Sequence, residues 1–151
     1  MEVMKMNIGE RIRYVRQFRG LTQEELAIKV GLGEGENGRT RISQYETGKR
    51  KPKEDMLEKI SKALNVHSLY LSTKEKTTAL DFAFSLLEWD IDNLPINIIN
   101  EDGKHLIHID NPIFEDFLRQ WAEKQNDLAD GKITKEEYIE WKINYGVPRE
   151  K

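Results

Sequence analysis

Hydrophobic residues recur every three or four positions through the first half of the chain, with polar residues between them. This period predicts short amphipathic helices, each with one apolar face. Glycines follow several of the periodic segments, where a left-handed residue commonly ends a helix. The predicted helices cover residues 6–19, 22–31, 39–48, 54–64 and 67–71.

The second helix has the clearest start. Thr22 is followed three residues later by Glu25, which is the spacing of a capping box. Leu21 and Leu26 lie where a hydrophobic staple would place them. The pattern therefore predicts that a helix begins at Thr22 and that a helix, not a strand, leads into the glycines that follow.

The pattern changes in the second half, which mixes helical and extended segments. Residues 79–89 place their apolar side chains at helical spacing. Two isoleucine-rich runs within residues 94–110 flank Asp102-Gly103, a dipeptide typical of a tight hairpin turn. The two remaining helices are predicted over residues 111–128 and 134–146.

The fold class is therefore predicted to be mainly α, with two domains. A five-helix domain covers residues 6–71, a linker covers 72–78, and a small acidic α+β domain covers 79–147. Charge follows the same division: residues 1–72 hold 14 Lys and Arg against 10 Asp and Glu, and residues 73–151 hold 10 against 17. This asymmetry indicates a basic module that contacts an anion and an acidic module that does not.

Composition excludes several classes of function. The chain has no cysteine, which removes disulfides, thiol catalysis and cysteine-ligated metals. No apolar run is long enough to cross a membrane, and the N-terminal residues do not resemble a signal peptide. We therefore expect a cytoplasmic protein with no membrane partner. No arrangement of residues indicates catalysis, and neither a cofactor nor a metal is expected.

Residues 33–38 read GEGENG and match the G-x-G-x-x-G pattern of phosphate-binding loops. That motif requires a strand before it and a helix after it. Here a helix precedes it, and Glu34 and Glu36 would repel a pyrophosphate. We interpret the glycines as a long turn between two helices.

Residues 126–137 resemble part of an EF-hand calcium loop, with Gly131 at the sixth position and Glu137 at the twelfth. Asn126 and Leu128 occupy the first and third positions, so one ligand is weakened and another is missing. A helix end, a glycine turn and a capped helix start explain the same residues.

His105 and His108 are a second candidate metal pair. They are three positions apart on a predicted strand, and side chains three apart on a strand point to opposite faces. A shared metal ion is therefore not expected.

Residues 8–66 resemble the Cro/cI-type (XRE) helix-turn-helix domain of phage and bacterial repressors. The resemblance lies in helix spacing, caps and turn glycines, in the segments IGERIRYVRQFRGLTQEELA (8–27), RISQYETGKRKP (41–52) and LEKISKAL (57–64). Ten residues separate Gly31 from Ile42, about five more than is usual in the family. GEGENG is thus a lengthened turn, with the third helix expected to start at Asn37 or Gly38.

The resemblance implies double-stranded DNA as the partner, with a recognition helix at about residues 39–46 in the major groove. The implied base contacts are Arg39, Thr40 and Gln44, since arginine and glutamine read base edges bidentately. The implied phosphate or flanking contacts are Gln23, Arg41, Ser43, Lys49, Arg50, Lys51 and Lys53. Arg16 and Glu46 resemble the internal ion pair of the family.

The sequence therefore predicts a sequence-specific transcriptional regulator, a dimeric repressor that reads a palindromic operator. Aromatic residues of the acidic domain, Phe114, Phe117 and Trp121 among them, would form dimer contacts or the core of that domain. An alternative is an antitoxin-like protein whose acidic half binds a protein partner while the first half autoregulates. A small ligand of the second domain also stays open. No Ala-Gly dipeptide is present, so repressor self-cleavage is not expected.

Overall fold

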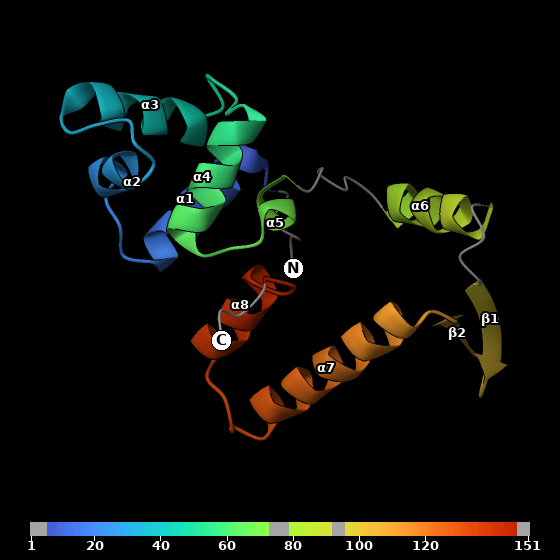
Figure 1. Ribbon diagram of the computed structural model, residues 1–151. Helices are drawn as coiled ribbons and strands as arrows, with labels where there is room; N and C mark the ends of the chain where they lie inside the picture. Colours follow the sequence, from blue (N-terminus) through green and yellow to red (C-terminus); the bar gives the residue numbers. More distant parts are fainter. Residues whose placement is uncertain (1–5, 73–78, 92–95, 148–151) are drawn as a thin grey trace. The chain divides into compact units, whose positions relative to one another are not determined.

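The computed structural model describes residues 6–72, 79–91 and 96–147 (Figure 1). Contacts divide the chain into two units. Unit 1 is Met1–Glu75 with Glu140–Lys151, and unit 2 is Lys76–Ile139. The described residues are mostly helical, with one two-stranded sheet, as the sequence predicts. In these ranges no helix is long and apolar enough to cross a membrane.

Unit 1 contains the five helices that the sequence predicts. Within it α3 packs against α1 and α2, and α4 packs against α1, α2 and α5. Figure 1 shows α2 and α3 together at one end of this bundle. The helices are α1 (Ile8–Phe18), α2 (Gln23–Lys29), α3 (Glu36–Glu46), α4 (Glu54–Leu64) and α5 (Ser68–Ser72).

The core of unit 1 takes apolar side chains from all five helices. Burying a side chain of the size of valine or leucine contributes about 1.5–3 kcal/mol. The core therefore fixes the rotation of each helix about its axis, including which face of α3 points outward. The fully buried residues of these helices are Ile12, Val15, Leu26, Ala27, Ile42, Ile60, Leu64 and Leu71.

Capping boxes begin α1 and α2. Thr22 Oγ1 accepts a hydrogen bond from the Glu25 N–H at 3.1 Å, and the Glu25 carboxylate accepts one from the Thr22 N–H at 2.7 Å. The hydrogen bond with the Thr22 backbone holds the pKa of Glu25 below its usual value. Asn7 and Glu10 form the same motif at α1. The Thr22 box is the predicted one, whereas the Asn7 box was not predicted.

The turn between α2 and α3 depends on glycine. Gly31, Gly33 and Gly35 have φ angles of 78°, 83° and 84°, in the region that side chains with a Cβ rarely adopt. Gly38 has a different role, because a Cβ there would lie 2.5 Å from the Gly33 carbonyl oxygen. The turn thus ends at Gly35, and residues 36–38 of the predicted turn belong to the following helix. The element before the turn is a helix, so the phosphate-loop pattern has no strand.

The start of α3 differs from the prediction. The helix begins at Glu36 with Gly35 as its N-cap, not at Asn37 or Gly38. The Gly35 carbonyl accepts a hydrogen bond from the Arg39 N–H at 3.2 Å. Since Gly35 is the last residue of the turn with a positive φ, the chain can enter helical conformation directly after it. α3 is thus about one turn longer than the recognition helix predicted at residues 39–46.

Unit 2 contains the predicted hairpin and helices. Asp102 and Gly103, with φ angles of 50° and 73°, form its tight turn, and the strands pair antiparallel from Ile96 with Ile109 to Glu101 with Lys104. Residues 94 and 95 of the predicted hairpin lie outside the described residues. The elements are α6 (Ala79–Ile91), β1 (Ile96–Glu101), β2 (Lys104–Ile109), α7 (Pro112–Ala129) and the first part of α8 (Lys135–Ile143).

The two segments that resemble metal-binding motifs form a strand and a turn between two helices. His105 pairs with Asn100 and His108 pairs with Asn97, so the two histidines lie on opposite faces of the hairpin, as predicted. Gly131 (φ 68°) follows the end of α7, and Thr134 Oγ1 accepts a hydrogen bond from the Glu137 N–H at 3.1 Å. Among the described residues no group of three or more His, Cys, Asp and Glu side chains could hold a metal ion.

Residues 140–147 lie against the helices of unit 1. The Arg19 guanidinium forms an ion pair with Glu140, with Nη2 and Oε1 2.8 Å apart. The His67 N–H donates to the Ile143 carbonyl at 3.2 Å, and the Ile143 side chain is buried. The predicted second domain, 79–147, differs from this division, because periodicity does not reveal which unit covers Ile143. Residues 73–78 of the predicted linker lie outside the described residues.

Candidate nucleic-acid interface

α3 presents one face to the core and the other to solvent. Ile42 and Tyr45 point inward, with 0% and 4% of their surface exposed. Arg39 and Thr40 are exposed. Residues three and four apart share a helix face. The outward face therefore also includes Glu36, one turn before Thr40, and Gln44, one turn after it. Burial of two core residues thus fixes which side chains of α3 can meet a ligand.

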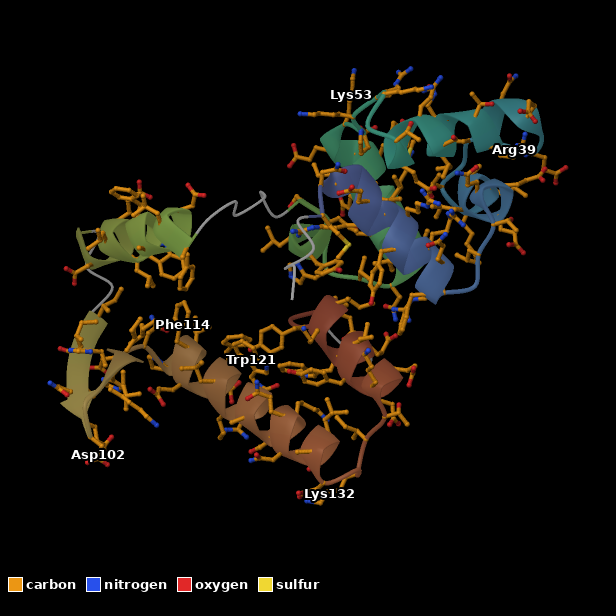
Figure 2. All side chains as sticks on the ribbon, turned by 180° about the vertical axis from the view of Figure 1, so that it is seen from behind. Arg39, Lys53, Asp102, Phe114, Trp121 and Lys132 are labelled. Atoms are coloured by element: carbon orange, nitrogen blue, oxygen red, sulfur yellow. The ribbon has the colours of Figure 1, made fainter. Side chains whose placement is uncertain are left out.

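A cleft of about 340 Å³ lies between the start of α2 and this outward face. All of its lining residues are polar. Six of them are residues for which the sequence predicts DNA contact, and Figure 2 shows one of these, Arg39, near the start of α3. The lining consists of Gln23, Glu36, Arg39, Thr40, Ser43, Gln44, Thr47 and Lys49.

The remaining predicted contacts lie outside this lining. Arg41 is half-buried, and Arg50, Lys51 and Lys53 are exposed in the turn between α3 and α4. Figure 2 shows Lys53 beyond the end of α3 opposite to Arg39. The Arg50 N–H donates to the Gln44 carbonyl at 3.1 Å, which ties the basic turn to α3.

Gln23 is connected to the core by its side chain. Its Nε2 donates to Glu46 Oε2 at 2.9 Å. Glu46 in turn forms a buried ion pair with Arg16, with Nε and Oε1 2.5 Å apart. The bond to Glu46 uses one amide donor of Gln23 and leaves its carbonyl oxygen and second N–H for another ligand.

Glu36 is a cleft residue that the sequence placed in the turn. Its Oε1 lies 2.9 Å from Arg39 Nη2 and 3.5 Å from Thr40 Oγ1. The hydrogen bond with Arg39 lowers the pKa of Glu36 and raises that of Arg39. A glutamate three residues before an arginine is a helical pairing signal that could have indicated the earlier helix start. Thr47, which also lines the cleft, carries no such signal.

The helices around the cleft fall within a known family. Residues 12–71 match the family model described as helix-turn-helix. These residues are therefore a helix-turn-helix domain. In this helix-turn-helix domain, α2 and α3 are the two helices of the motif, and the glycine-rich segment between them is its turn.

A curated relative is similar to about half of this chain. The HTH-type transcriptional regulator ImmR of Bacillus subtilis (strain 168) is 36% identical over 73 residues, which are 48% of this chain and 54% of ImmR. The chain thus spans about half the length of this curated relative.

Two solved structures are also similar. The P22 c2 repressor in complex with a synthetic operator is 31% identical, with a TM-score of 0.41, and the match covers 46% of this chain and 98% of the repressor chain. A chain of the SinR–SinI complex is 25% identical, with a TM-score of 0.42, and the match covers 79% of this chain and 98% of that one.

Proposed function

We propose that this protein is a sequence-specific DNA-binding transcriptional regulator that acts as a repressor in the cytoplasm. The polar cleft on the outward face of α3 carries the proposal. Arg39, Thr40 and Gln44 line it together, and a helix of this kind inserts its N-terminal side chains into the major groove. Arginine pairs with the guanine acceptors and glutamine with the adenine edge, which discriminates by about 1–3 kcal/mol for each pair.

The basic side chains around the cleft support contacts with the DNA backbone. Lys49 lines the cleft, and the exposed residues Arg50, Lys51 and Lys53 follow it in the turn. Contacts with phosphate give affinity and salt dependence, and they do not select sequence. We propose that these four side chains hold the domain on the duplex while the α3 face reads the bases.

A dimer that reads a palindromic operator is the second part of the proposal. Of the fourteen exposed large hydrophobic side chains in the described residues, twelve belong to unit 2, where Ile109 is the one buried hydrophobic residue. A unit of this size with so little buried apolar surface needs further apolar contact for stability. A second copy supplies such a surface and places two recognition helices on one operator.

The dimer is tested by light scattering on the full chain. We expect twice the mass of the chain for the wild type and a monomer for Leu87→Glu, which places a charge on an exposed apolar position of α6. Leu69→Glu is the matched control, because Leu69 is 67% exposed, against 58% for Leu87, but belongs to unit 1. A monomeric wild type would contradict the dimer and leave DNA recognition to be judged separately.

DNA binding is tested with the segment directly upstream of the protein's own gene, since such regulators often control their own promoters. We expect tight binding that resists competitor DNA and weakens steeply as salt rises. Unrelated DNA of the same length is the control. If selection from a randomised duplex pool also yields no preferred sequence, the proposal is wrong.

Charge favours one alternative function. Residues 73–151 carry 17 acidic and 10 basic side chains, and an acidic surface with exposed apolar residues also suits a basic protein partner. In this alternative unit 2 binds the partner, as in an antitoxin, and the helix-turn-helix domain autoregulates. Affinity purification from the native host discriminates, because the alternative requires that a basic protein encoded beside the gene is captured repeatedly.

A further inference from the structure

We propose that Glu36 determines the base preference of this helix-turn-helix domain by positioning Arg39. The proposal rests on the proposed function, since it concerns how the same cleft selects DNA. It gives a role to the lengthened turn, which places an acidic residue at the first position of the recognition helix. Glu36 is a positioning residue, since its effect passes through the guanidinium of Arg39.

The turn holds Glu36 in a defined place. The Gly35 N–H donates to Glu24 Oε1 at 3.0 Å, which ties the start of α3 to α2. The Gly35 carbonyl caps the first turn through the Arg39 N–H. Glu36 and Arg39 are therefore fixed on successive turns of one helix, and their side chains are exposed by 73% and 55% at the mouth of the cleft.

The contact leaves Arg39 able to read a base. A guanidinium has five N–H donors, and the bond to Glu36 uses one of those on Nη2. The second N–H of Nη2, together with the neighbouring N–H of Nε or Nη1, remains for the paired acceptors of a guanine. Because the carboxylate restrains the guanidinium before DNA arrives, less conformational freedom is lost when the base contact forms.

The same carboxylate opposes binding to the wrong sequence. It cancels much of the attraction between Arg39 and DNA phosphate, which is independent of sequence. Glu24 also lies close enough to interact with Arg39 electrostatically. DNA that lacks the matching base therefore gains little from Arg39, whereas DNA that has it gains two directed hydrogen bonds.

Two substitutions with the same change in charge test the proposal. Glu36→Gln removes the carboxylate that contacts Arg39. Glu34→Gln removes an exposed carboxylate from the same turn, and in the described part of the chain Glu34 makes no hydrogen bond or ion pair. The wild type first selects its site from a randomised duplex pool, and each variant is then titrated with that site and with its single-base variants.

We expect Glu34→Gln to raise affinity for all these sequences by one common factor. Glu36→Gln should in addition reduce discrimination at one base position by about tenfold, with other positions unchanged. In the Arg39→Ala background, Glu36→Gln should leave every base preference unaltered. Thermal unfolding of each variant checks that the fold is intact.

Three results would overturn the inference. These are equal base preferences in Glu36→Gln and Glu34→Gln, an effect of Glu36→Gln that persists without Arg39, and a wild type that selects no sequence. The third result overturns the proposed function as well. The first two leave DNA recognition standing and reject the role of Glu36 alone.

Discussion

Arg16 on α1 and Glu46 at the end of α3 are joined by two hydrogen bonds, with Nε–Oε1 at 2.5 Å and Nη2–Oε2 at 3.0 Å. Only 10% and 2% of their side-chain surfaces are exposed. Glu46 Oε2 also accepts from Gln23 at the mouth of the cleft. One buried carboxylate thus connects the core of the domain to a residue that lines the polar cleft.

Removing one member of this pair should destabilise the fold. Glu46→Leu leaves the Arg16 charge buried and unpaired, and we expect the free energy of unfolding to fall by about 3–5 kcal/mol. The double variant Arg16→Met/Glu46→Leu should recover most of that loss, because apolar side chains fill the same space without a buried charge. Urea unfolding measures the free energy of unfolding of both variants. A double variant as unstable as Glu46→Leu would contradict the reasoning.

Gly38→Ala should destabilise the domain although alanine favours helices. The added Cβ would lie 2.5 Å from the Gly33 carbonyl oxygen and 3.0 Å from the Ala27 Cβ, so the glycine turn or α3 must shift. Overpacking of this kind costs about 1–3 kcal/mol. Asn37→Ala is the control, since Asn37 is exposed on the same turn of α3. Thermal unfolding should show a lower Tm for the Gly38 variant alone.

Arg39→Ala and Lys51→Ala should weaken DNA binding in different ways. Loss of Arg39 should relax specificity at one base position, at a cost of about 1–3 kcal/mol for the preferred sequence. Loss of Lys51 should weaken all sequences alike and reduce the slope of log K against log salt by about 1. Titrations of operator and mismatched duplexes at several salt concentrations separate the two effects. Identical behaviour of the variants would refute these assignments.

The sequence was sufficient for most of the fold of unit 1. The apolar period, the Thr22–Glu25 box and the glycines after the first three helices predict where the helices lie, because these signals are local. The start of α3 was placed too late for a local reason as well. Three glycines in six residues suggest a turn throughout, yet Gly38 serves close packing against Gly33 rather than backbone freedom.

Tertiary relationships could not be predicted in the same way. No local signal indicates that Ile143 is buried in unit 1, or that Glu140 pairs with Arg19, more than a hundred residues away in the sequence. The candidate site followed from the family resemblance, which supplied the outward face of α3. The resemblance did not indicate Glu36, because the longer turn creates this position and the family pattern has no residue that corresponds to it.

Ile143→Ala tests how strongly the last helical segment stabilises unit 1. The side chain is 3% exposed, and truncation of a buried isoleucine costs about 2–5 kcal/mol. Hydrogen exchange should become faster at the His67 amide, which donates to the Ile143 carbonyl. Leu69→Ala is the control, because that side chain is 67% exposed. Unchanged exchange at His67 would show that residues 140–147 contribute little to unit 1.

The capping box of α2 should make stability depend on pH. The pKa of Glu25 is lower in the folded protein, chiefly through its hydrogen bond with the Thr22 backbone. Ionised Glu25 therefore stabilises the fold above the pKa of the unfolded state, about 4.3. This stabilisation is lost as pH falls through the pKa of the folded state. Between pH 7 and pH 3 the wild type should lose more stability than Glu25→Gln. Urea unfolding at several pH values measures this loss. An equal loss of stability in the wild type and in Glu25→Gln would contradict the prediction.

Ile143 belongs to unit 1 but follows unit 2 in the sequence, and this order has a consequence during synthesis. The ribosome releases α1 to α5 first and Ile143 only after all of residues 76–139. At about 5–20 residues per second this delay lasts several seconds. During that interval the nascent helix-turn-helix domain lacks part of its core, so its final stability is reached only once the acidic unit has been made.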